Sequence, residues 1–424
     1  MTRLDPGERR SSLAALAHRD FALLWSGQAI SLVGDGIFTV TLALEALHLD
    51  PRPLALSIVL AARLLPTVLL LLLGGVIVDR MPRRLAMLIS DGTRGLAVAI
   101  IAILVWSGQA RLWQLILMAI VFGAADALFY PAETAVVPEV LPADLLVQGS
   151  ALNRLSQTVA MALVGPALGG VVVASFGTGW GFALDALSFG VSAAALIAMR
   201  RIPRPTPSGR SMIADALEGL RYVRTQPWFW VTLVVAGLAN FAAFSPLAVT
   251  VPLLVRRVLN EGPSALGLVI AAGGIGGAVT SLLLARWGAP RRRITAMMVG
   301  WSLSGAAMVL LGLAPQIWLV GLGQFLVFAG LVYGNTIWSA LMQDLVPANL
   351  LGRASSVDWL VSICLSPLGM LVAGFAAGVV GVRNTLVAGG VFATLMVVAL
   401  LVPGVRDPER QSPEQRAESK TGPR

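Results

Sequence analysis

Long apolar segments recur along the whole chain and limit what it can fold into. A membrane-spanning helix needs about 20 mainly apolar residues, and about twelve such segments fit into the 424 residues. Charged residues form 12% of the chain, whereas an average soluble domain has about 25%. The sequence therefore predicts an all-α polytopic membrane protein. The expected spans are residues 21–47, 54–78, 85–106, 113–137, 146–175, 181–199, 228–254, 265–287, 294–314, 317–345, 354–378 and 385–403.

The two halves of the chain resemble each other in sequence. Residues 142–150 read PADLLVQGS and align without a gap with residues 347–355, which read PANLLGRAS. Parallel six-span repeats place a substrate site near the middle of the membrane, between the two halves. We therefore expect two pseudo-symmetric six-helix bundles, at residues 21–199 and 228–403.

Basic residues indicate how the chain lies in the membrane. The linker 200–227, the tails 1–20 and 404–424 and the loops on their side hold most of the arginines, because positive residues favour the cytoplasmic side. We expect both termini in the cytoplasm, a disordered C-terminal tail, and a location in the cell membrane. Apolar residues at helical spacing in the linker predict an amphipathic helix on the membrane surface, the alternative being a solvated tether. The opposite loops hold Arg52, Arg111, Arg256, Arg257 and Arg383.

A short charged turn separates the second and third expected spans. Residues 75–84 read GVIVDRMPRR, which resembles the G-x-x-x-D-R-x-G-R-R signature of the major facilitator superfamily, with Pro82 in place of the glycine. The resemblance implies the major facilitator fold, and a gate at which the acid of this turn docks on the start of the eleventh span. The expected gate residues are Gly75, Asp79, Arg80, Arg83, Arg84 and Arg353. A topology signal with a helix cap is the alternative role.

Other segments are similar to one branch of that superfamily. Residues 24–28 (LWSGQ), 62–66 (ARLLP), 184–189 (LDALSF) and 218–224 (EGLRYVR) resemble the branch with the enterobactin exporter and macrolide efflux proteins. One stretch on the fifth span also resembles the end of the antiporter motif of drug exporters. Its residues are Gly165, Pro166, Gly169 and Gly170.

Ionisable residues inside spans are expensive and point to function. Asp35 is our main candidate for proton coupling, since it lies mid-span between two glycines. At a rise of about 1.5 Å per residue, Asp35 and Arg63 lie about 21 Å and 22 Å from the inner ends of their spans. We expect them to pair, with the arginine approaching and withdrawing during the cycle. The alternative is a permanent bridge between the first two helices. Asp126 is the candidate for a second proton carrier.

Further charges cluster on the third to fifth spans. With Asp126, these residues form an expected charge network, which acts either as a structural clamp or as a proton path. Asp185 lies on the sixth span, and we interpret it as structural. The remaining members of the network are Asp91, Arg94, Glu133 and Arg154.

Aromatic and amide side chains in the second half favour an amphipathic organic substrate. Pro246 predicts a kink in the seventh span because proline removes a backbone donor. Simple helix packing is the alternative explanation for each residue. The expected cavity residues are Asn240, Phe241, Phe244, Tyr333, Asn335, Trp338 and Trp359.

Other chemistries find no support in the sequence. It has no Gly-x-x-x-x-Gly-Lys-Ser/Thr loop for ATP and no His-Glu-x-x-His metal motif. We expect no enzyme activity, cofactor, metal or nucleic-acid partner. We expect a monomeric, lipid-embedded exporter that exchanges a drug, macrolide or siderophore-like compound for protons by alternating access. An importer or a lysophospholipid flippase of the same fold, and a receptor or scaffold, remain alternatives.

Overall fold

The computed structural model describes residues 14–78, 80–200, 212–347 and 350–410, within which every regular element is a helix. Twelve helical segments of this part of the chain are long and apolar enough to cross a membrane. The predicted all-α fold with two pseudo-symmetric six-helix bundles is confirmed. The elements of the first half are η1 (Ala14–Ala17), α1 (Arg19–Leu49), α2 (Pro53–Val78), α3 (Arg83–Trp106), α4 (Leu112–Val140), η2 (Ala143–Leu145), α5 (Leu146–Ser156), η3 (Gln157–Val164), α6 (Gly165–Phe176) and α7 (Thr178–Ala198).

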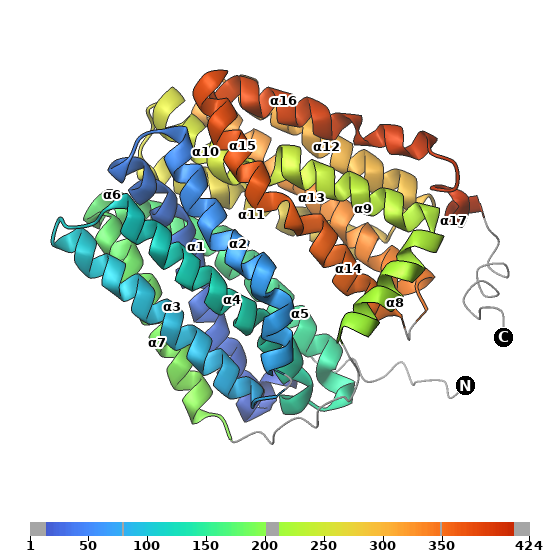
Figure 1. Ribbon diagram of the computed structural model, residues 1–424, viewed down its shortest axis with the longest axis horizontal. Coiled ribbons are helices and arrows are strands. Elements are labelled where there is room, and N and C mark those ends of the chain that lie inside the picture. Colours follow the sequence, from blue (N-terminus) through green and yellow to red (C-terminus); the bar gives the residue numbers. More distant parts are fainter. Residues whose placement is uncertain (1–13, 79, 201–211, 348–349, 411–424) are drawn as a thin grey trace.

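The helices form two groups that follow the two halves of the chain (Figure 1). We call the end of the molecule where α1 begins and α2 ends the terminal end. The far end is the one with the α1–α2 turn at residues 50–52. The linker helix α8 packs on α14. The elements after the first half are α8 (Met212–Thr225), α9 (Pro227–Ala239), η4 (Asn240–Phe244), α10 (Leu247–Leu253), η5 (Leu254–Val258), α11 (Pro263–Trp287), α12 (Arg293–Leu313), α13 (Ile317–Leu345), α14 (Leu351–Cys364), α15 (Ser366–Val379), α16 (Val382–Thr394), η6 (Leu395–Leu401) and α17 (Asp407–Arg410).

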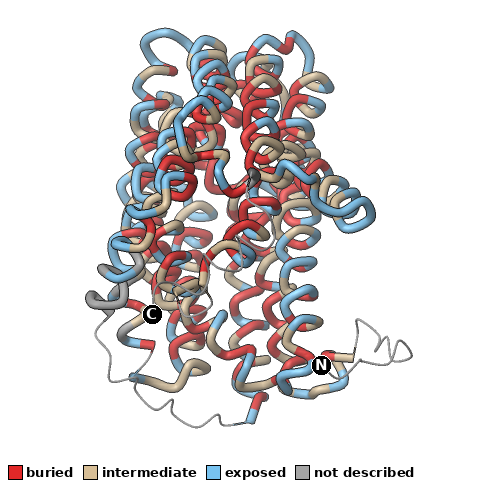
Figure 2. The backbone as a smooth tube through the Cα atoms, turned by 90° about the vertical axis from the view of Figure 1, so that its right-hand side faces the viewer, coloured by how far each residue is buried: buried red, intermediate tan, exposed pale blue. Residues whose placement is uncertain are grey.

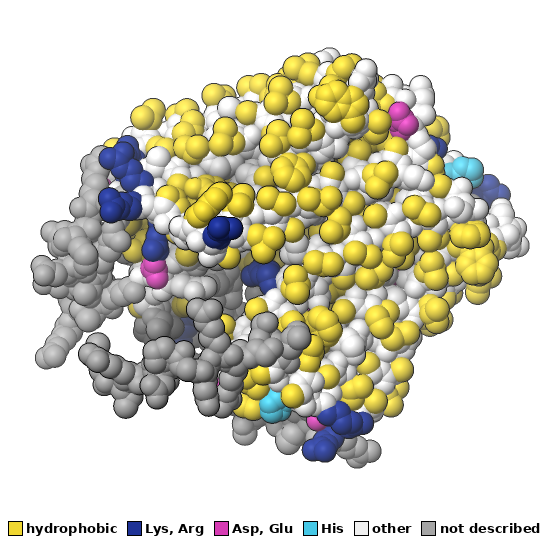
Figure 3. Space-filling view, turned by 180° about the vertical axis from the view of Figure 1, so that it is seen from behind, with side chains coloured by type: hydrophobic (Ala, Val, Ile, Leu, Met, Phe, Trp, Pro, Cys, Tyr) yellow, Lys and Arg dark blue, Asp and Glu magenta, His cyan; other side chains and the backbone are white. Residues whose placement is uncertain are grey.

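The molecule is apolar both inside and outside. Buried residues line the inward sides of the helices (Figure 2), and Phe38, Phe122 and Phe182 are fully buried in the first half. Large apolar side chains also cover the outer surface, where Leu69 is 65% and Leu282 is 70% exposed. The face seen in Figure 3 is mostly hydrophobic, and its charged side chains gather toward the edges. Such a surface is that of a protein embedded in lipid.

Prolines interrupt three of the spans. Before Pro166, residues of η3 form a π-helix, and α6 begins at Gly165. Before Pro367, α14 ends at Cys364 and α15 begins at Ser366. A proline has no N–H for the carbonyl four residues earlier, so the helix widens or breaks there. The two sites are related by the internal repeat, which therefore extends to the backbone. The kink predicted at Pro246 is confirmed, since η4 ends before it and α10 begins after it.

Small residues bring the two halves into contact near the far end. Gly170 of α6 lies against Pro263 and Gly267 of α11, and Gly374 of α15 lies against Ser57 of α2. A Cβ atom on Gly170 would lie 2.8 Å from the carbonyl oxygen of Pro263, which is closer than real side chains approach. These two contacts are pseudo-symmetric, fifth span with eighth and eleventh with second. They close the far end of the molecule.

Candidate functional site

A buried network of two arginines and two aspartates lies inside the first half. Arg94 of α3 donates hydrogen bonds to Asp91 on the same helix, at 2.5 Å, and to Asp126 of α4, at 3.1 Å. Arg63 of α2 lies 3.7 Å from the other oxygen of Asp126. Two positive and two negative charges balance, which buried ions require. The network therefore needs no further ion or proton.

Hydrogen bonds extend this network to two more helices. Ser192 of α7 donates to Asp91 at 2.6 Å, and Gln28 of α1 donates to Ser192 at 2.9 Å. Gly27 allows this contact, because its backbone lies directly against Ser192. Our sequence analysis did not single out Gln28 and Ser192. The available signal was a polar side chain next to a small residue within each span.

Aromatic rings cover the network. The Arg63 guanidinium lies 4.5 Å from the ring centroid of Phe122, which stacks on Phe38 at 4.7 Å. The Arg94 guanidinium lies 4.2 Å from the ring of Phe129 and 4.6 Å from that of Phe189. Cation–π contacts of this kind contribute about 0.5–2 kcal/mol each. The rings also exclude water, which strengthens the ion pairs among them.

The expected ion pair between Asp35 and Arg63 is not formed in this structure. Arg63 pairs with Asp126 instead. The cause is the close packing of α2 on α4, where the backbone of Gly123 lies against the Arg63 carbonyl. Asp126 follows Gly123 by about one helical turn and so faces the same side of α4. The two expected coupling residues Arg63 and Asp126 thus pair with each other, and Asp35 forms no ion pair with Arg63.

Asp35 is buried without a counter-charge in contact. Its side chain lies in α1 at 8% exposure, and its Oδ1 accepts no hydrogen bond within the described part of the chain. The neighbouring Gly36 lies against Gly165 of α6, and Gly34 lies against Asp185 and Ser188 of α7. The two glycines let α6 and α7 approach the acid from either side. Asp35 is therefore a carboxyl group in an apolar, narrow setting beside a neutral charge network.

Asp185 has the same character. It is 0% exposed, and neither of its carboxylate oxygens has a hydrogen-bond partner among the described residues. Ser188, the nearest hydroxyl on its own helix, donates to the Asp185 backbone carbonyl at 2.8 Å.

Two residues of the expected charge network lie outside it. Glu133 of α4 is half-buried and Arg154 of α5 is exposed, and neither forms an ion pair within the described ranges. Arg154 lies nearer the terminal end, where water competes with ion pairs. The structure thus brings together Asp91, Arg94 and Asp126 of the predicted set and leaves the other two apart.

The arginines of the charged turn bind within the first half. Arg83 donates to the Ala135 carbonyl at 2.8 Å and to Glu139, both on α4. Arg84 donates to the Ile197 carbonyl at the end of α7, at 2.8 Å. Both are favourable because cations stabilise the carbonyl-rich ends of helices. In this structure they fix the terminal ends of α4 and α7.

The rest of the expected gate is only partly visible. Asp79 lies outside the described residues. Gly75 is half-buried near the end of α2, and Arg80 is exposed. Arg353, at the start of α14, pairs with Glu218 of α8 at 2.6 Å. The contact between Asp79 and the eleventh span stays a prediction.

The antiporter-like motif packs α6 between two helices. Gly165 lies against Gly36 and Gly169 lies against Ile37, both on α1. Gly170 faces the other way, onto α11 of the second half. Pro166 ends the π-helix before them. The motif thus connects the surroundings of Asp35 directly to the interface between the halves.

The expected cavity residues differ in their surroundings. Asn240, Phe241 and Phe244 lie half-buried on the π-helix η4, and Trp359 of α14 is 47% exposed. π-helical turns occur often at functional sites. These residues are thus available for contact with a ligand, within the second half.

Three others are engaged by their neighbours. Trp338 is buried, packs on Trp228 and Phe229 with ring centroids 5.8 Å and 5.3 Å away, and donates to Asp358 at 3.0 Å. Asn335 accepts a hydrogen bond from Trp301 at 3.0 Å. Tyr333 is half-buried, and its ring lies against the backbone of Gly300. Trp338 therefore contributes to packing within the second half in this structure.

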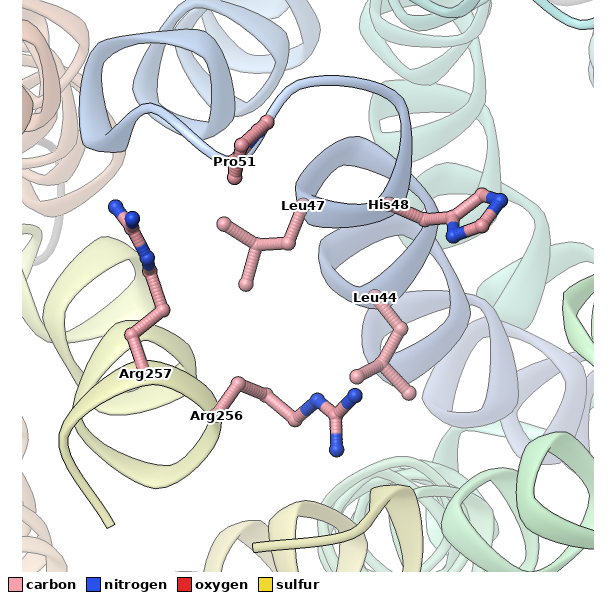
Figure 4. Close-up of a pocket in the computed structure, with 6 residues that line it drawn as sticks. All are labelled: Leu44, Leu47, His48, Pro51, Arg256 and Arg257. Atoms are coloured by element: carbon pink, nitrogen blue, oxygen red, sulfur yellow. The ribbon is translucent and has the colours of Figure 1, made fainter. Parts of the chain in front are cut away.

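A pocket of about 280 Å³ opens at the far end, between α1 and η5 (Figure 4). Its basic side chains come from η5, opposite the α1 residues (Figure 4). The nearby Asp50 is bound by Arg52, whose hydrogen bonds hold the pKa of Asp50 below its usual range. Its charge is therefore already balanced. The lining residues are Leu44, Leu47, His48, Pro51, Arg256 and Arg257.

The chain is similar in sequence to a protein family and to known transporters. The family model described as "Transmembrane secretion effector" matches residues 10–423. Macrolide efflux protein A of Streptococcus pyogenes is 22% identical over 396 residues, covering 91% of this chain and 96% of that protein. Multidrug efflux pump Tap of Mycobacterium tuberculosis is 27% identical over 398 residues, covering 89% of this chain and 92% of the pump.

Solved structures share the fold. A bacterial homologue of the human lysosomal transporter Spinster, in an inward-facing and unoccupied conformation, superposes with a TM-score of 0.70 at 16% identity. That alignment covers 96% of this chain and 100% of the other. A bacterial homologue of the iron transporter ferroportin, in an inward-facing state, also gives 0.70 at 15% identity, covering 90% and 98%.

Proposed function

The chain belongs to the transmembrane secretion effector family of major facilitator transporters, and we propose that it exports amphipathic organic compounds in exchange for protons. The family and its efflux-pump relatives make it a transporter and not an enzyme. The cargo class we propose is a drug, a macrolide or a siderophore-like compound. Transport runs by alternating access, with the site exposed first to one side of the membrane and then to the other.

The burial of Asp35 carries the proton part of the proposal. Its neighbours Arg63, Arg94, Asp91 and Asp126 already balance one another's charges. A carboxylate left in an apolar site without a partner favours its neutral form. Asp35 therefore binds a proton in this conformation and releases it when water or a cation reaches it. That exchange is what couples a proton gradient to a conformational change.

The path from Asp35 to the moving parts is short. Gly36, the next residue, packs on Gly165 of α6, and Gly170 of the same helix closes the far end against α11. A rotation of α6 that opens this contact also changes the packing around Asp35. The π-helix η3 gives that span a weak point at which to move.

The distribution of arginines supports an orientation of the protein in the cell membrane. By our assignment of spans, the loops opposite the termini hold five arginines, three lie within spans, and the terminal end holds the rest. Because basic loops stay in the cytoplasm, we place both termini there and the far end outside. Protons then enter from the far end and leave at the terminal end.

The second half supplies the contacts for cargo. Phe241, Phe244 and Trp359 offer apolar rings, and Asn240 offers an amide. Aromatic walls with a few polar groups fix amphipathic molecules in binding sites. The relatives are named for the efflux of macrolides and of several drugs, which supports the same cargo class here.

A compound panel tests the proposal. Cells containing the full chain are loaded with ethidium, a macrolide or a siderophore, and efflux is followed with the proton gradient intact and collapsed. We expect efflux of at least one amphipathic compound, and its loss when the gradient is collapsed. Efflux that continues at the same rate without the gradient would overturn proton antiport. Gradient-driven accumulation in the cell would overturn the direction.

A further inference from the structure

We propose that Asp185 is the proton-sharing partner of Asp35, so that these two buried carboxyl groups hold one proton between them. The inference rests on the proposed function, since it names a second residue of the same proton site. From the sequence we interpreted Asp185 as structural. The geometry of its surroundings points to a different role.

Asp185 is a buried acid without a compensating partner among the described residues. Its residue is 0% exposed, and both carboxylate oxygens have no hydrogen-bond partner within the described residues. A structural aspartate in a protein interior normally accepts hydrogen bonds from backbone or side chains. The hydroxyl closest to it in the helix, Ser188, is bound to a backbone carbonyl instead. Nothing in its surroundings fixes Asp185 as a structural anion.

The absence of a side chain at Gly34 brings the two acids together. A Cβ atom on Gly34 would lie 2.7 Å from Oδ1 of Asp185, so the carboxyl group of α7 rests directly on the backbone of α1. Asp35 is the next residue of α1 and is likewise buried, with its own Oδ1 unpartnered. The charges of the two residues act on each other. Both acids therefore lie buried beside the α1–α7 contact at Gly34.

The other charged groups around Asp35 and Asp185 cannot neutralise both acids. Arg63 and Arg94 act on Asp185 from α2 and α3, as Asp126 does from α4. Asp91 acts on Asp35 from α3. Glu133 and Tyr130 of α4 also act on Asp35. Both arginines are bound within their own network, so the charged residues here comprise five acids and two bases. Two adjacent carboxylates in such a site cannot both be charged at little cost, and they titrate as a pair.

The pair has a mechanical consequence. While it holds its proton, α1 and α7 can pack tightly at Gly34. Loss of the proton leaves two negative charges facing each other across the α1–α7 contact. That contact then weakens, on the same helix that carries the α6 contact of Gly36. Asp185 in this way links the charge of Asp35 to the α1–α7 contact.

The test follows the pH dependence of the conformation of the purified full chain without substrate. Cys364 is replaced by serine, and spin labels at Gln109 and Gly378 report the distance between the halves at the far end. Wild type is titrated beside Asp35→Asn and Asp185→Asn. We expect a pH-dependent distance in wild type, none in Asp35→Asn, and in Asp185→Asn a midpoint lower by about one pH unit or more, because the repelling charge is gone. An unchanged midpoint in Asp185→Asn would overturn the inference.

A matched control separates this effect from a general loss of negative charge. Glu45 is also buried in α1, at 2% exposure, but it accepts a hydrogen bond from Thr178 at 2.5 Å. It lies about 15 Å along the helix from Asp35, at about 1.5 Å per residue. We expect Glu45→Gln to titrate like wild type. A shift of the same size in Glu45→Gln would contradict a specific pair.

Chemical labelling of the wild-type protein tests, without any variant at Asp185, whether Asp35 and Asp185 share a proton. Dicyclohexylcarbodiimide is a lipophilic reagent that attacks protonated carboxyl groups, and peptide mapping then locates the label. In wild type near neutral pH we expect labels divided between Asp35 and Asp185, with about one per molecule. Label on Asp35 alone, or on neither residue, would overturn the shared proton. If the wild-type distance does not depend on pH at all, the proton coupling itself fails, which is a different outcome.

Discussion

The guanidinium of Arg63 lies 3.7 Å from the carboxylate of Asp126, and this pairing determines which acid of the first half is left for a proton. With Arg94 and Asp91 it completes a network whose charges cancel. Asp35, which the sequence matched with Arg63 by depth, is left outside that network. The network therefore acts as a rigid neutral frame, and Asp35 with Asp185 forms the part that can change its charge.

Removal of Arg94 should destabilise the first half strongly. Arg94→Leu leaves Asp91 and Asp126 buried without their cation, and breaking a buried pair in this way costs about 3–5 kcal/mol. We expect a markedly lower midpoint of thermal unfolding in detergent. Arg63→Leu should cost less, since the Arg63 side chain is 20% exposed and pairs at a longer distance. Equal midpoints of thermal unfolding for Arg94→Leu and wild type would refute the role of this network as a structural clamp.

A side chain at Gly170 should hold the far end open. Gly170→Val places atoms where Pro263 and Gly267 now lie, so the fifth and eighth spans cannot close. We expect a longer distance between labels at Gln109 and Gly378, and loss of transport with normal membrane insertion. Gly190→Ala is the control, because a Cβ at that position meets nothing within 4 Å. A wild-type distance in Gly170→Val would show that this contact does not close the far end.

Loss of the acid in the charged turn should open the terminal end. We expect Asp79→Ala to shift the population toward inward-open states, since the acid no longer docks on the start of the eleventh span. Distances between labels on α5 and α13 measure the shift. Asp344→Asn serves as control, because it removes an exposed acid that pairs with Arg293 within the second half. Unchanged α5–α13 label distances in Asp79→Ala would show that Asp79 does not act as a gate residue.

Substitutions of Trp359 and Trp338, both in the second half, should have different effects. Trp359 is 47% exposed, so Trp359→Ala should raise the substrate concentration for half-maximal efflux and leave unfolding unchanged. Trp338 is buried among Trp228 and Phe229, so Trp338→Ala should cost about 3–5 kcal/mol of stability. Efflux kinetics and thermal unfolding of both variants measure this. The reverse pattern would mean that Trp338, and not Trp359, contacts the cargo.

Local signals allowed the sequence to predict much of the fold. Apolar runs determine the spans, and Pro246 determines a kink, because both act on the backbone where they occur. The repeat of residues 142–150 at 347–355 predicted two matching bundles. The structure extends that repeat to the breaks at Pro166 and Pro367.

The partners of charged residues could not be predicted in this way. Depth in the membrane follows from counting residues, but the direction of a side chain around its helix depends on which helices pack together. Arg63 meets Asp126 because Gly123 lets α4 approach α2. Asp185 rests on the backbone of α1 next to Asp35 because Gly34 lets α7 approach α1. In both cases the glycine lies close to one residue of the pair in sequence, but the helix that packs on it is distant in sequence and is known only from the folded structure.

Transport by Asp35→Asn in proteoliposomes tests the central claim most directly, once the compound panel has provided a substrate. The variant keeps the size of the side chain and removes its exchangeable proton. We predict that it exchanges labelled for unlabelled substrate at equal pH as wild type does, and that a pH gradient no longer drives net movement. Net substrate movement driven by the pH gradient at the wild-type rate would contradict the proposal that proton exchange at Asp35 couples the gradient to transport.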